Sequence, residues 1–230
     1  MLKENICSCE DCESRWPNFN ALTKEELDFV SLSRFEASFK PGEVILKQGS
    51  PASNAVFLLY GLAKVYMEGQ GERNFILNIA RPGKMIIGPG IYTDSRHIFT
   101  ASALNDVRAC FIDSNVIRKL VKQNSDFAEG MLRDVSYKAE NNFYKLMSMT
   151  QKKMPGRVAE VLLYLSENIF ESDEFTLLLT RQELADMSGM AKESVVRILK
   201  EFSNEKIIDS GSSEFRILNK ERLKMISING

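Results

Sequence analysis

The stretch from Ser125 to Lys153 constrains the fold most strongly, because it contains no proline and a single glycine, Gly130. Within it, a set of mostly apolar residues is spaced alternately four and three positions apart. A period of 3.5 residues is typical of a helix that packs along a second helix in a two-stranded coiled coil. The predicted seam consists of Ala128, Leu132, Val135, Ala139, Asn142, Leu146 and Met149. We therefore predict a dimerisation helix over 125–153 and a homodimer.

Asn142 is the polar member of an otherwise apolar seam. A lone polar residue at such a position commonly fixes the register of the two helices at some cost in stability. The alternative is a long helix that lies on the preceding domain of the same chain. The 3.5-residue period favours dimerisation.

The chain before this helix alternates short apolar runs with turns that contain glycine and proline. These runs are Val44–Leu46, Val56–Tyr60, Ala63–Tyr66, Phe75–Ile79, Met85–Ile87, Phe99–Leu104 and Cys110–Ile112. Many short strands with regular turns are typical of a β-barrel or sandwich. A capping box at Thr23–Glu26 opens a short helix ahead of them. We predict a β-roll or jelly-roll domain over 21–124, preceded by a cysteine-containing tail over 1–20.

The C-terminal part, 155–230, has the pattern of a winged helix-turn-helix. Pro155-Gly156 interrupts the long helix and is the predicted domain boundary. A second capping box, Thr180–Glu183, opens a helix that Gly189 ends. In the next helix the residues at i, i+3, i+4 and i+7 spacing form a buried face: Val195, Ile198, Leu199 and Phe202. A hairpin of Ile207-Ile208, a turn over 210–213 and Phe215–Ile217 forms the wing, so the whole chain is predicted as α+β.

Composition excludes several classes of protein. The net charge is −1, so a surface that binds nucleic acid must be local. There is one histidine, His97, and we find no phosphate-binding loop, which leaves the chain poor in enzymatic signals. No apolar run approaches the ~18 residues of a membrane span, and the N-terminus does not read as a signal peptide. We therefore predict a cytoplasmic protein that is neither an enzyme nor bound to membranes.

The N-terminal part of the second helix of a helix-turn-helix enters the major groove of DNA. Lys192, Glu193 and Arg197 occupy that part of the predicted helix. Arg and Lys donate to guanine O6 and N7, and Glu accepts from cytosine N4. The alternative is an i, i+4 ion pair between Glu193 and Arg197 on a solvated face, worth about 0.3 kcal/mol.

Two segments resemble the Crp/Fnr family of bacterial transcription regulators. LTRQELADMSGMAKESVVRILKEF, residues 179–202, is similar to the helix-turn-helix signature of that family. KPGEVILKQGSPASNAVFLLYGLAKVY, residues 40–66, is similar to its cyclic-nucleotide-type β-roll, with glycines at Gly42, Gly49 and Gly61. The order of parts also agrees, which implies a sensor roll, a dimerisation helix and a DNA-binding domain.

This resemblance implies roles for single residues. Glu193 and Arg197 take the base-reading positions, and Lys192 takes a further one. Thr180, Arg181 and Gln182 would approach the phosphate backbone, and Ser194 completes the predicted DNA-binding set. The resemblance also implies a palindromic promoter site and RNA polymerase as a partner. Ala191 stands where a serine would usually cap the recognition helix, and Val196 replaces Gly or Ser, so the preferred DNA sequence is not implied.

The effector is not implied by the resemblance. In Gly88–Val107, Pro89 stands near the position of a ligand-binding Glu, and His97-Ile98 stands where an Arg-Ser pair would hold a cyclic phosphate. A buried phosphate needs donors and a cation, so we do not expect cyclic AMP. The candidate effector pocket is Tyr92, Arg96 and His97, with a solvated loop tip as the alternative.

The four cysteines suggest a redox alternative. Cys7, Cys9, Cys12 and Cys110 resemble the oxygen-sensing Fnr branch, which implies an iron–sulfur cluster on these four thiols. Their spacing departs from that branch, and the neighbouring acidic residues disfavour several thiolates. Zinc on the same ligands, or a mobile tail with a buried Cys110, are alternatives. An unidentified small ligand, haem or no ligand also remain open.

Overall fold

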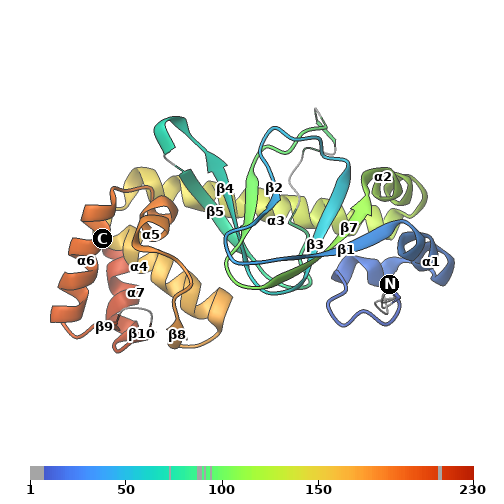
Figure 1. Cartoon of the computed structure of the whole chain (residues 1–230). Helices are drawn as coiled ribbons and strands as arrows, with labels where there is room; N and C mark the ends of the chain where they lie inside the picture. The colour runs from blue at the N-terminus through green and yellow to red at the C-terminus, as the bar shows by residue number, and fades with distance from the viewer. Residues whose placement is uncertain (1–7, 73, 87–89, 91, 94, 212–213) are drawn as a thin grey trace. The chain divides into compact units, whose positions relative to one another are not determined.

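The computed structural model describes residues 8–72, 74–86, 90, 92–93, 95–211 and 214–230. The chain forms two compact units. The first comprises the chain up to Glu68 together with Leu77–Lys138, and the second comprises Gly69–Ile76 together with Ala139–Gly230. Figure 1 labels most of the helices and strands.

Two antiparallel sheets build the roll. One has the order β1-β7-β3, and the other has the order β2-β6-β4-β5. The strands are β1 (Arg34–Phe39), β2 (Val44–Leu46), β3 (Asn54–Tyr60), β4 (Ala63–Glu68), β5 (Asn74–Ala80), β6 (Thr100–Ala103) and β7 (Val107–Asp113). The accompanying helices are η1 (Pro17–Ala21), α1 (Lys24–Leu32), η2 (Gln70–Glu72) and α2 (Ser114–Gln123). This jelly roll confirms the predicted fold class.

The strands of the structure differ from the predicted apolar runs at two places, β1 and Met85. β7 is the central strand of its sheet, and Cys110 pairs with Glu36 on one side and with Phe57 on the other. β1 was missed because its sequence, RFEASF, lacks a continuous apolar run. The run at Met85 was predicted as a strand, but among the described residues it forms only an isolated bridge to Phe57.

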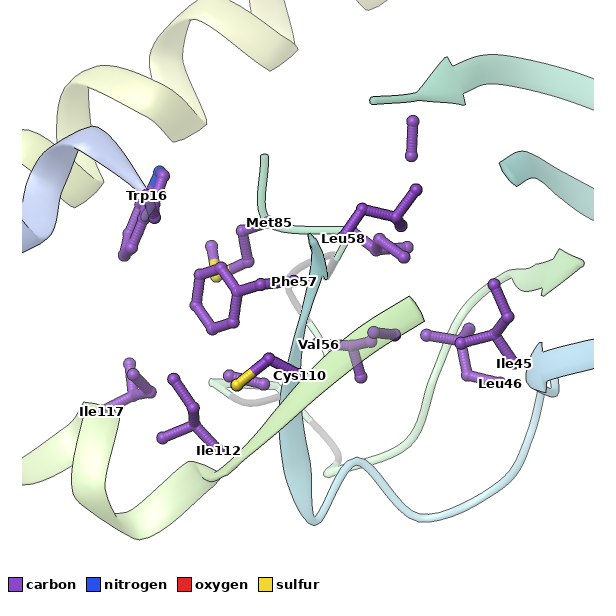
Figure 2. Close-up of a cluster of buried hydrophobic side chains, with 14 of the residues drawn as sticks. Trp16, Ile45, Leu46, Val56, Phe57, Leu58, Met85, Cys110, Ile112 and Ile117 are labelled. Atoms are coloured by element: carbon purple, nitrogen blue, oxygen red, sulfur yellow. The ribbon is translucent and has the colours of Figure 1, made fainter. Parts of the chain in front are cut away.

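The core of the roll collects residues from strands, helices and the N-terminal segment. Figure 2 shows Trp16 near Phe57 and Met85, with Cys110, Ile112 and Ile117 below them. The Trp16 ring centroid lies 5.4 Å from that of Phe57 and 5.7 Å from that of Phe127. Aromatic pairs at such distances contribute beyond their buried area.

The N-terminal segment is therefore part of the roll, and the prediction of a separate tail over 1–20 is wrong for the residues that the structure describes. Trp16 is 2% exposed, Phe19 is 4% exposed and Cys9 is 6% exposed. The indole Nε1 of Trp16 donates to Asp134 Oδ2 at 3.0 Å. The hydroxyl of Ser14 donates to the main-chain oxygen of Leu59 at 2.8 Å. These contacts join residues that lie far apart in the sequence.

Trp16→Phe is expected to destabilise the first unit by about 1–2 kcal/mol, because it removes a hydrogen bond to a carboxylate and some buried volume. Urea unfolding followed by circular dichroism measures this change. Asp134→Asn keeps an oxygen acceptor for the indole and is the matched control, with a smaller expected loss. Wild-type stability of Trp16→Phe would mean that the segment does not unfold with the roll.

Helix α3 (Ser125–Gln151) is the long helix predicted from the sequence. Its N-terminal part packs on the roll, where Phe127 is fully buried. On the same side Lys138 Nζ donates to the main-chain oxygen of Met85 at 3.2 Å. Among the described residues, no helix is apolar enough over a sufficient length to cross a membrane.

The second unit contains a helix-turn-helix and a three-stranded sheet with the order β8-β10-β9. Its elements after α3 are α4 (Met154–Tyr164), the π-helical turn η4 (Leu165–Phe170), β8 (Glu174–Thr176), α5 (Arg181–Ser188), α6 (Lys192–Asn204), β9 (Ile208–Ser210), β10 (Glu214–Ile217) and α7 (Lys220–Asn229). Neither β8 nor α7 was predicted. The residues 212–213 of the predicted turn lie outside the described part of the chain.

The break after α3 comes earlier than predicted. α3 ends at Gln151, and Lys153 is the N-cap of α4, so Pro155-Gly156 lies inside α4. Proline is tolerated in the first turn of a helix because its missing N–H would have no partner there. The division between the compact units lies earlier still, between Lys138 and Ala139.

Lys145 of α3 is partly buried within the second unit. Its Nζ donates to the main-chain oxygen of Ile76 at 2.6 Å and lies 4.8 Å from the Phe75 ring centroid. Burial lowers the pKa of Lys145 from an ordinary 10.5 to about 8, and the nearby Glu160 carboxylate opposes this shift. Between these two pH values the unfolded chain binds more protons than the folded chain.

The free energy of unfolding is therefore expected to rise between pH 8 and pH 10.5, with Lys145 contributing roughly 1–3 kcal/mol. Lys145→Met should remove this contribution. Urea unfolding at a series of pH values gives the difference between the two proteins. Lys200→Met, at an exposed position of α6, controls for the loss of one charge. A parallel pH dependence in wild type and Lys145→Met would contradict the assignment.

Candidate nucleic-acid interface

Helix α5 begins as the sequence predicts. The Thr180 hydroxyl oxygen accepts from the Glu183 N–H at 3.2 Å, and the Glu183 carboxylate accepts from the Thr180 N–H at 2.7 Å. This reciprocal capping box fixes the start of the helix. Gly189 ends α5 with a φ of 64°, in the left-handed region that favours glycine. The turn to α6 is thus defined at both of its ends.

Helix α6 is anchored on its buried face, as predicted. Val195, Ile198, Leu199 and Phe202 are each at most 4% exposed. Ala191 is the N-cap and forms no side-chain capping bond. The first turn of α6 therefore keeps N–H groups that no side-chain cap occupies, and such groups favour an anion near the helix N-terminus.

The predicted base-reading residues lie on the exposed side of α6. Lys192, Glu193 and Arg197 are exposed, and Val196 among them is 45% exposed. Ser194 is half-buried. The alternative, an ion pair between Glu193 and Arg197, is not formed, and Arg197 Nη1 instead lies 3.1 Å from Glu201 Oε1. Glu201, one helical turn further, stands at the same i, i+4 spacing from Arg197.

At the start of α5, Thr180 and Gln182 are exposed, whereas Arg181 is half-buried. Gln182 Nε2 donates to Asp186 Oδ1 at 2.8 Å. Arg181 Nη2 donates to the main-chain oxygen of Gly211 at 3.3 Å. Burial lowers the pKa of Arg181. Arg181 therefore connects α5 to the wing.

The predicted seam of α3 is largely exposed in the single chain. Leu132 is 66% exposed, Val135 is 53% exposed and Leu146 is 60% exposed. Ala139 and Asn142 are also exposed, whereas Ala128 is half-buried. Apolar side chains this exposed along one helix are typical of an interaction surface. Met149 differs, because its side chain lies against Gly189 of the helix-turn-helix.

The predicted effector residues have separate environments. Tyr92 is 54% exposed, whereas His97 is only 8% exposed, and burial lowers the pKa of its imidazole. Arg96 Nη1 donates to the main-chain oxygen of Gly49 at 2.5 Å. His97 is therefore not at a solvated loop tip, and Arg96 fastens its loop to the turn at Gly49. Pro89 lies outside the described residues.

The three described cysteines are not gathered into a metal site. Cys9 and Cys110 are buried, Cys12 is half-buried, and Cys7 lies outside the described residues. Burial raises the pKa of the Cys110 thiol to about 11, against the opposing effect of Arg34, whose Nη1 lies 3.7 Å from Cys110 Sγ. A metal ligand must be a thiolate. Within the described ranges no group of three or more His, Cys, Asp or Glu is placed to hold a metal ion.

Comparison with known domains matches two separate parts of the chain. The Crp-like helix-turn-helix domain matches residues 156–226, and the cyclic nucleotide-binding domain matches residues 36–124. The cyclic nucleotide-binding match runs from within β1 through β7 and α2, and the helix-turn-helix match covers α5, α6 and the wing (Figure 1).

Relatives and solved structures of similar length agree with these matches. The transcriptional regulator SdrP of Thermus thermophilus is 27% identical over 84% of this chain and 95% of its own. A CRP-like cAMP-activated global transcriptional regulator of Mycobacterium tuberculosis is 24% identical over 80% of this chain and 84% of its own. FixK2 from Bradyrhizobium japonicum has a similar fold, with a TM-score of 0.76 at 20% identity over 84% of this chain and 96% of that chain.

Proposed function

Because the chain belongs to the Crp/Fnr family of transcription regulators, we propose that it binds promoter DNA as a homodimer, with one copy of α6 in each half-site. The exposed row Lys192, Glu193 and Arg197 carries this proposal. The buried face of α6 fixes the helix on its own domain, so the opposite face is free to enter a major groove.

The chemistry of the row supports base recognition. Arg197 donates to O6 and N7 of a guanine, and Lys192 provides a second donor. Glu193 accepts from the N4 amino group of a cytosine, which explains a carboxylate on a surface that faces phosphates. Arg197 is held by Glu201 at 3.1 Å in the free chain and exchanges this partner for the base.

The start of α5 supports positioning on the DNA backbone. The Thr180 oxygen accepts a capping bond, and its hydroxyl proton stays available for a phosphate oxygen. Gln182 is exposed beside it, and Ser194 lies near the start of α6. Contacts to phosphates fix the register of the protein on the duplex without reading its sequence.

The exposed seam of α3 supports the dimer. Pairing two α3 helices buries Leu132, Val135 and Leu146 against their equivalents, as in a two-stranded coiled coil. A twofold dimer presents two recognition helices to half-sites about one DNA turn apart, so a palindromic promoter site is expected. RNA polymerase is the further partner that family membership suggests.

In the binding experiment the protein is titrated into fluorescently labelled promoter DNA at several salt concentrations, and binding is measured by fluorescence anisotropy. The operator is first selected in vitro from random DNA. Each neutralised phosphate contributes about −0.9 to the slope of log K against log salt, so a steep slope is expected despite the net charge of −1. Absence of salt-dependent binding to any selected sequence would reject the proposal.

Val196 gives a sharper test of how α6 enters the groove. An apolar side chain at an exposed position of a recognition helix contacts the C5-methyl group of thymine. Replacing that thymine by uracil removes one methyl, so wild type is expected to lose about 0.8 kcal/mol of binding free energy per half-site. Val196→Ser should lose this preference, which anisotropy with single dT→dU operators measures. An equal effect of every replacement on both proteins would show that Val196 contacts no thymine.

The roll serves as the sensor domain in this proposal, and the protein acts as a regulator rather than as an enzyme. An effector must bind one of two dimer geometries better than the other. Cyclic AMP is not the proposed effector, because Ile98 stands where a phosphate would need a donor, and Arg96 is already bonded to Gly49. The place of action is the cytoplasm, where promoter DNA is found.

A redox effector on Cys7, Cys9, Cys12 and Cys110 stays a prediction from the sequence. Metal analysis and an anaerobic visible spectrum test it directly. Iron–sulfur absorption with bound iron would establish it, and a colourless, metal-free protein that still binds the operator would reject it.

A further inference from the structure

The C-terminal end of α3 belongs to the same compact unit as the helix-turn-helix. This unit includes every residue from Ala139 to Gly230. The last turns of α3 therefore have two neighbours in the proposed dimer. One is the partner helix along the seam, and the other is the domain that carries α6.

Met149 is the seam position at which these two roles separate. An ideal Cβ added to Gly189 would lie 2.9 Å from Met149 Cε and 3.7 Å from Met149 Sδ. The Met149 side chain thus packs directly across the main chain of Gly189. Gly189 has a φ of 64° and ends α5, three residues before α6 begins. The contact is therefore made at the turn from which the recognition helix starts.

The position of Met149 is itself fixed by residues at the end of α3 and just after it. The hydroxyl of Ser148 donates to the carboxylate of Glu160 in α4. Lys152 Nζ lies 3.3 Å from the same carboxylate and 3.4 Å from the Ser227 hydroxyl of α7. These contacts tie the end of α3 to α4 and α7, and Met149 lies within the stretch that they hold.

We propose that Met149 is a positioning residue for the recognition helix, which holds the turn at Gly189 from the end of the dimerisation helix. This inference rests on the proposed function and adds a route for its regulation. In the proposed dimer Leu146, one turn earlier, faces the partner helix, whereas Met149 contacts the turn. A shift of one α3 helix against the other therefore moves the start of α6 in the same body.

The test compares Met149→Ala with Leu146→Ala, since the sequence pattern treats both residues alike. Operator affinity is measured by anisotropy, and dimer dissociation is measured by sedimentation equilibrium. Met149→Ala is expected to weaken operator binding about 2- to 30-fold, the range found for residues that couple sites without touching the ligand. Its dimer dissociation constant should stay as in wild type. Leu146→Ala should weaken the dimer, with unchanged operator affinity at concentrations that saturate dimerisation.

Two further variants distinguish loss of the contact between Met149 and Gly189 from general destabilisation of the fold. Met149→Leu retains apolar bulk and should restore operator affinity to within about twofold of wild type. Gly189→Ala places a methyl group against Met149, so its effect on operator affinity should differ between the wild-type and Met149→Ala backgrounds. Additive effects of the two changes would overturn the proposal. So would wild-type operator binding by Met149→Ala, or a loss confined to its dimerisation.

Hydrogen exchange tests the role of Met149 without DNA, and therefore independently of the proposed function. Met149→Ala should speed exchange of the main-chain amides from Gly189 to Lys192, whether or not DNA is present. If wild type bound no operator, the proposed function would fail while this measurement still tested the contact. Unchanged exchange in that segment would reject the positioning role.

Discussion

Replacing Leu146 by aspartate is expected to convert the dimer into monomers and to remove tight binding to an operator with two half-sites. Leu146 is 60% exposed in the single chain and lies at the seam of α3. Burying one leucine contributes about 1.5–3 kcal/mol, and twofold symmetry applies the change twice. Aspartate adds two buried like charges, so the dimer dissociation constant should rise by a factor of about 100 or more.

Sedimentation equilibrium measures the dimer, and anisotropy with a full and a single half-site measures DNA binding. Tyr144→Asp is the matched control. Tyr144 is also an exposed apolar side chain of α3, at 59%, but two residues along a helix place it on nearly the opposite side. Its substitution should leave the dimer intact. A dimer that survives Leu146→Asp but not Tyr144→Asp would place the interface on the other face of α3.

Arg197→Ala is expected to cost about 1–3 kcal/mol of discrimination at one base pair of each half-site. The loss is doubled over a palindromic operator because the dimer carries two copies of α6. Competition between the selected operator and variants changed at single positions measures this discrimination. An unchanged ratio between operator and random DNA would remove Arg197 from the base-reading set.

Glu201→Ala is the control for Arg197→Ala, because it removes the ion pair between the two residues and keeps the arginine. It frees Arg197 from its partner at 3.1 Å without altering the guanidinium. An exposed pair of this kind contributes only about 0.3–0.5 kcal/mol. Glu201→Ala should therefore leave discrimination intact and change overall affinity slightly, while Arg197→Ala should change discrimination itself.

Local patterns in the sequence predicted the DNA-binding unit well. The capping box at Thr180–Glu183, the glycine at position 189 and the buried face of α6 all depend on residues within one or two turns of each other. Interactions between residues this close in the chain can be inferred from the sequence itself. Ala191 as an uncapped helix start was also confirmed, because capping depends on the chemistry of that one side chain.

Features that depend on distant partners could not be predicted. Trp16 is buried because Asp134, Phe57 and Phe127 surround it, and none of these residues is near it in the sequence. Met149 continues the 3.5-residue period, yet its contact is set by the direction that the chain takes after Gln151. The burial of His97 likewise depends on the turn at Gly49 and Ser50.

Lys138 and Lys145 both bond to main-chain oxygens, those of Met85 and Ile76. Every amino acid carries a main-chain carbonyl, so these two bonds do not depend on which side chain stands at position 76 or 85. Apolar substitutions in these segments can therefore accumulate over evolution while the segments stay fastened to α3. The sequence is therefore constrained at the two lysines rather than at Ile76 and Met85.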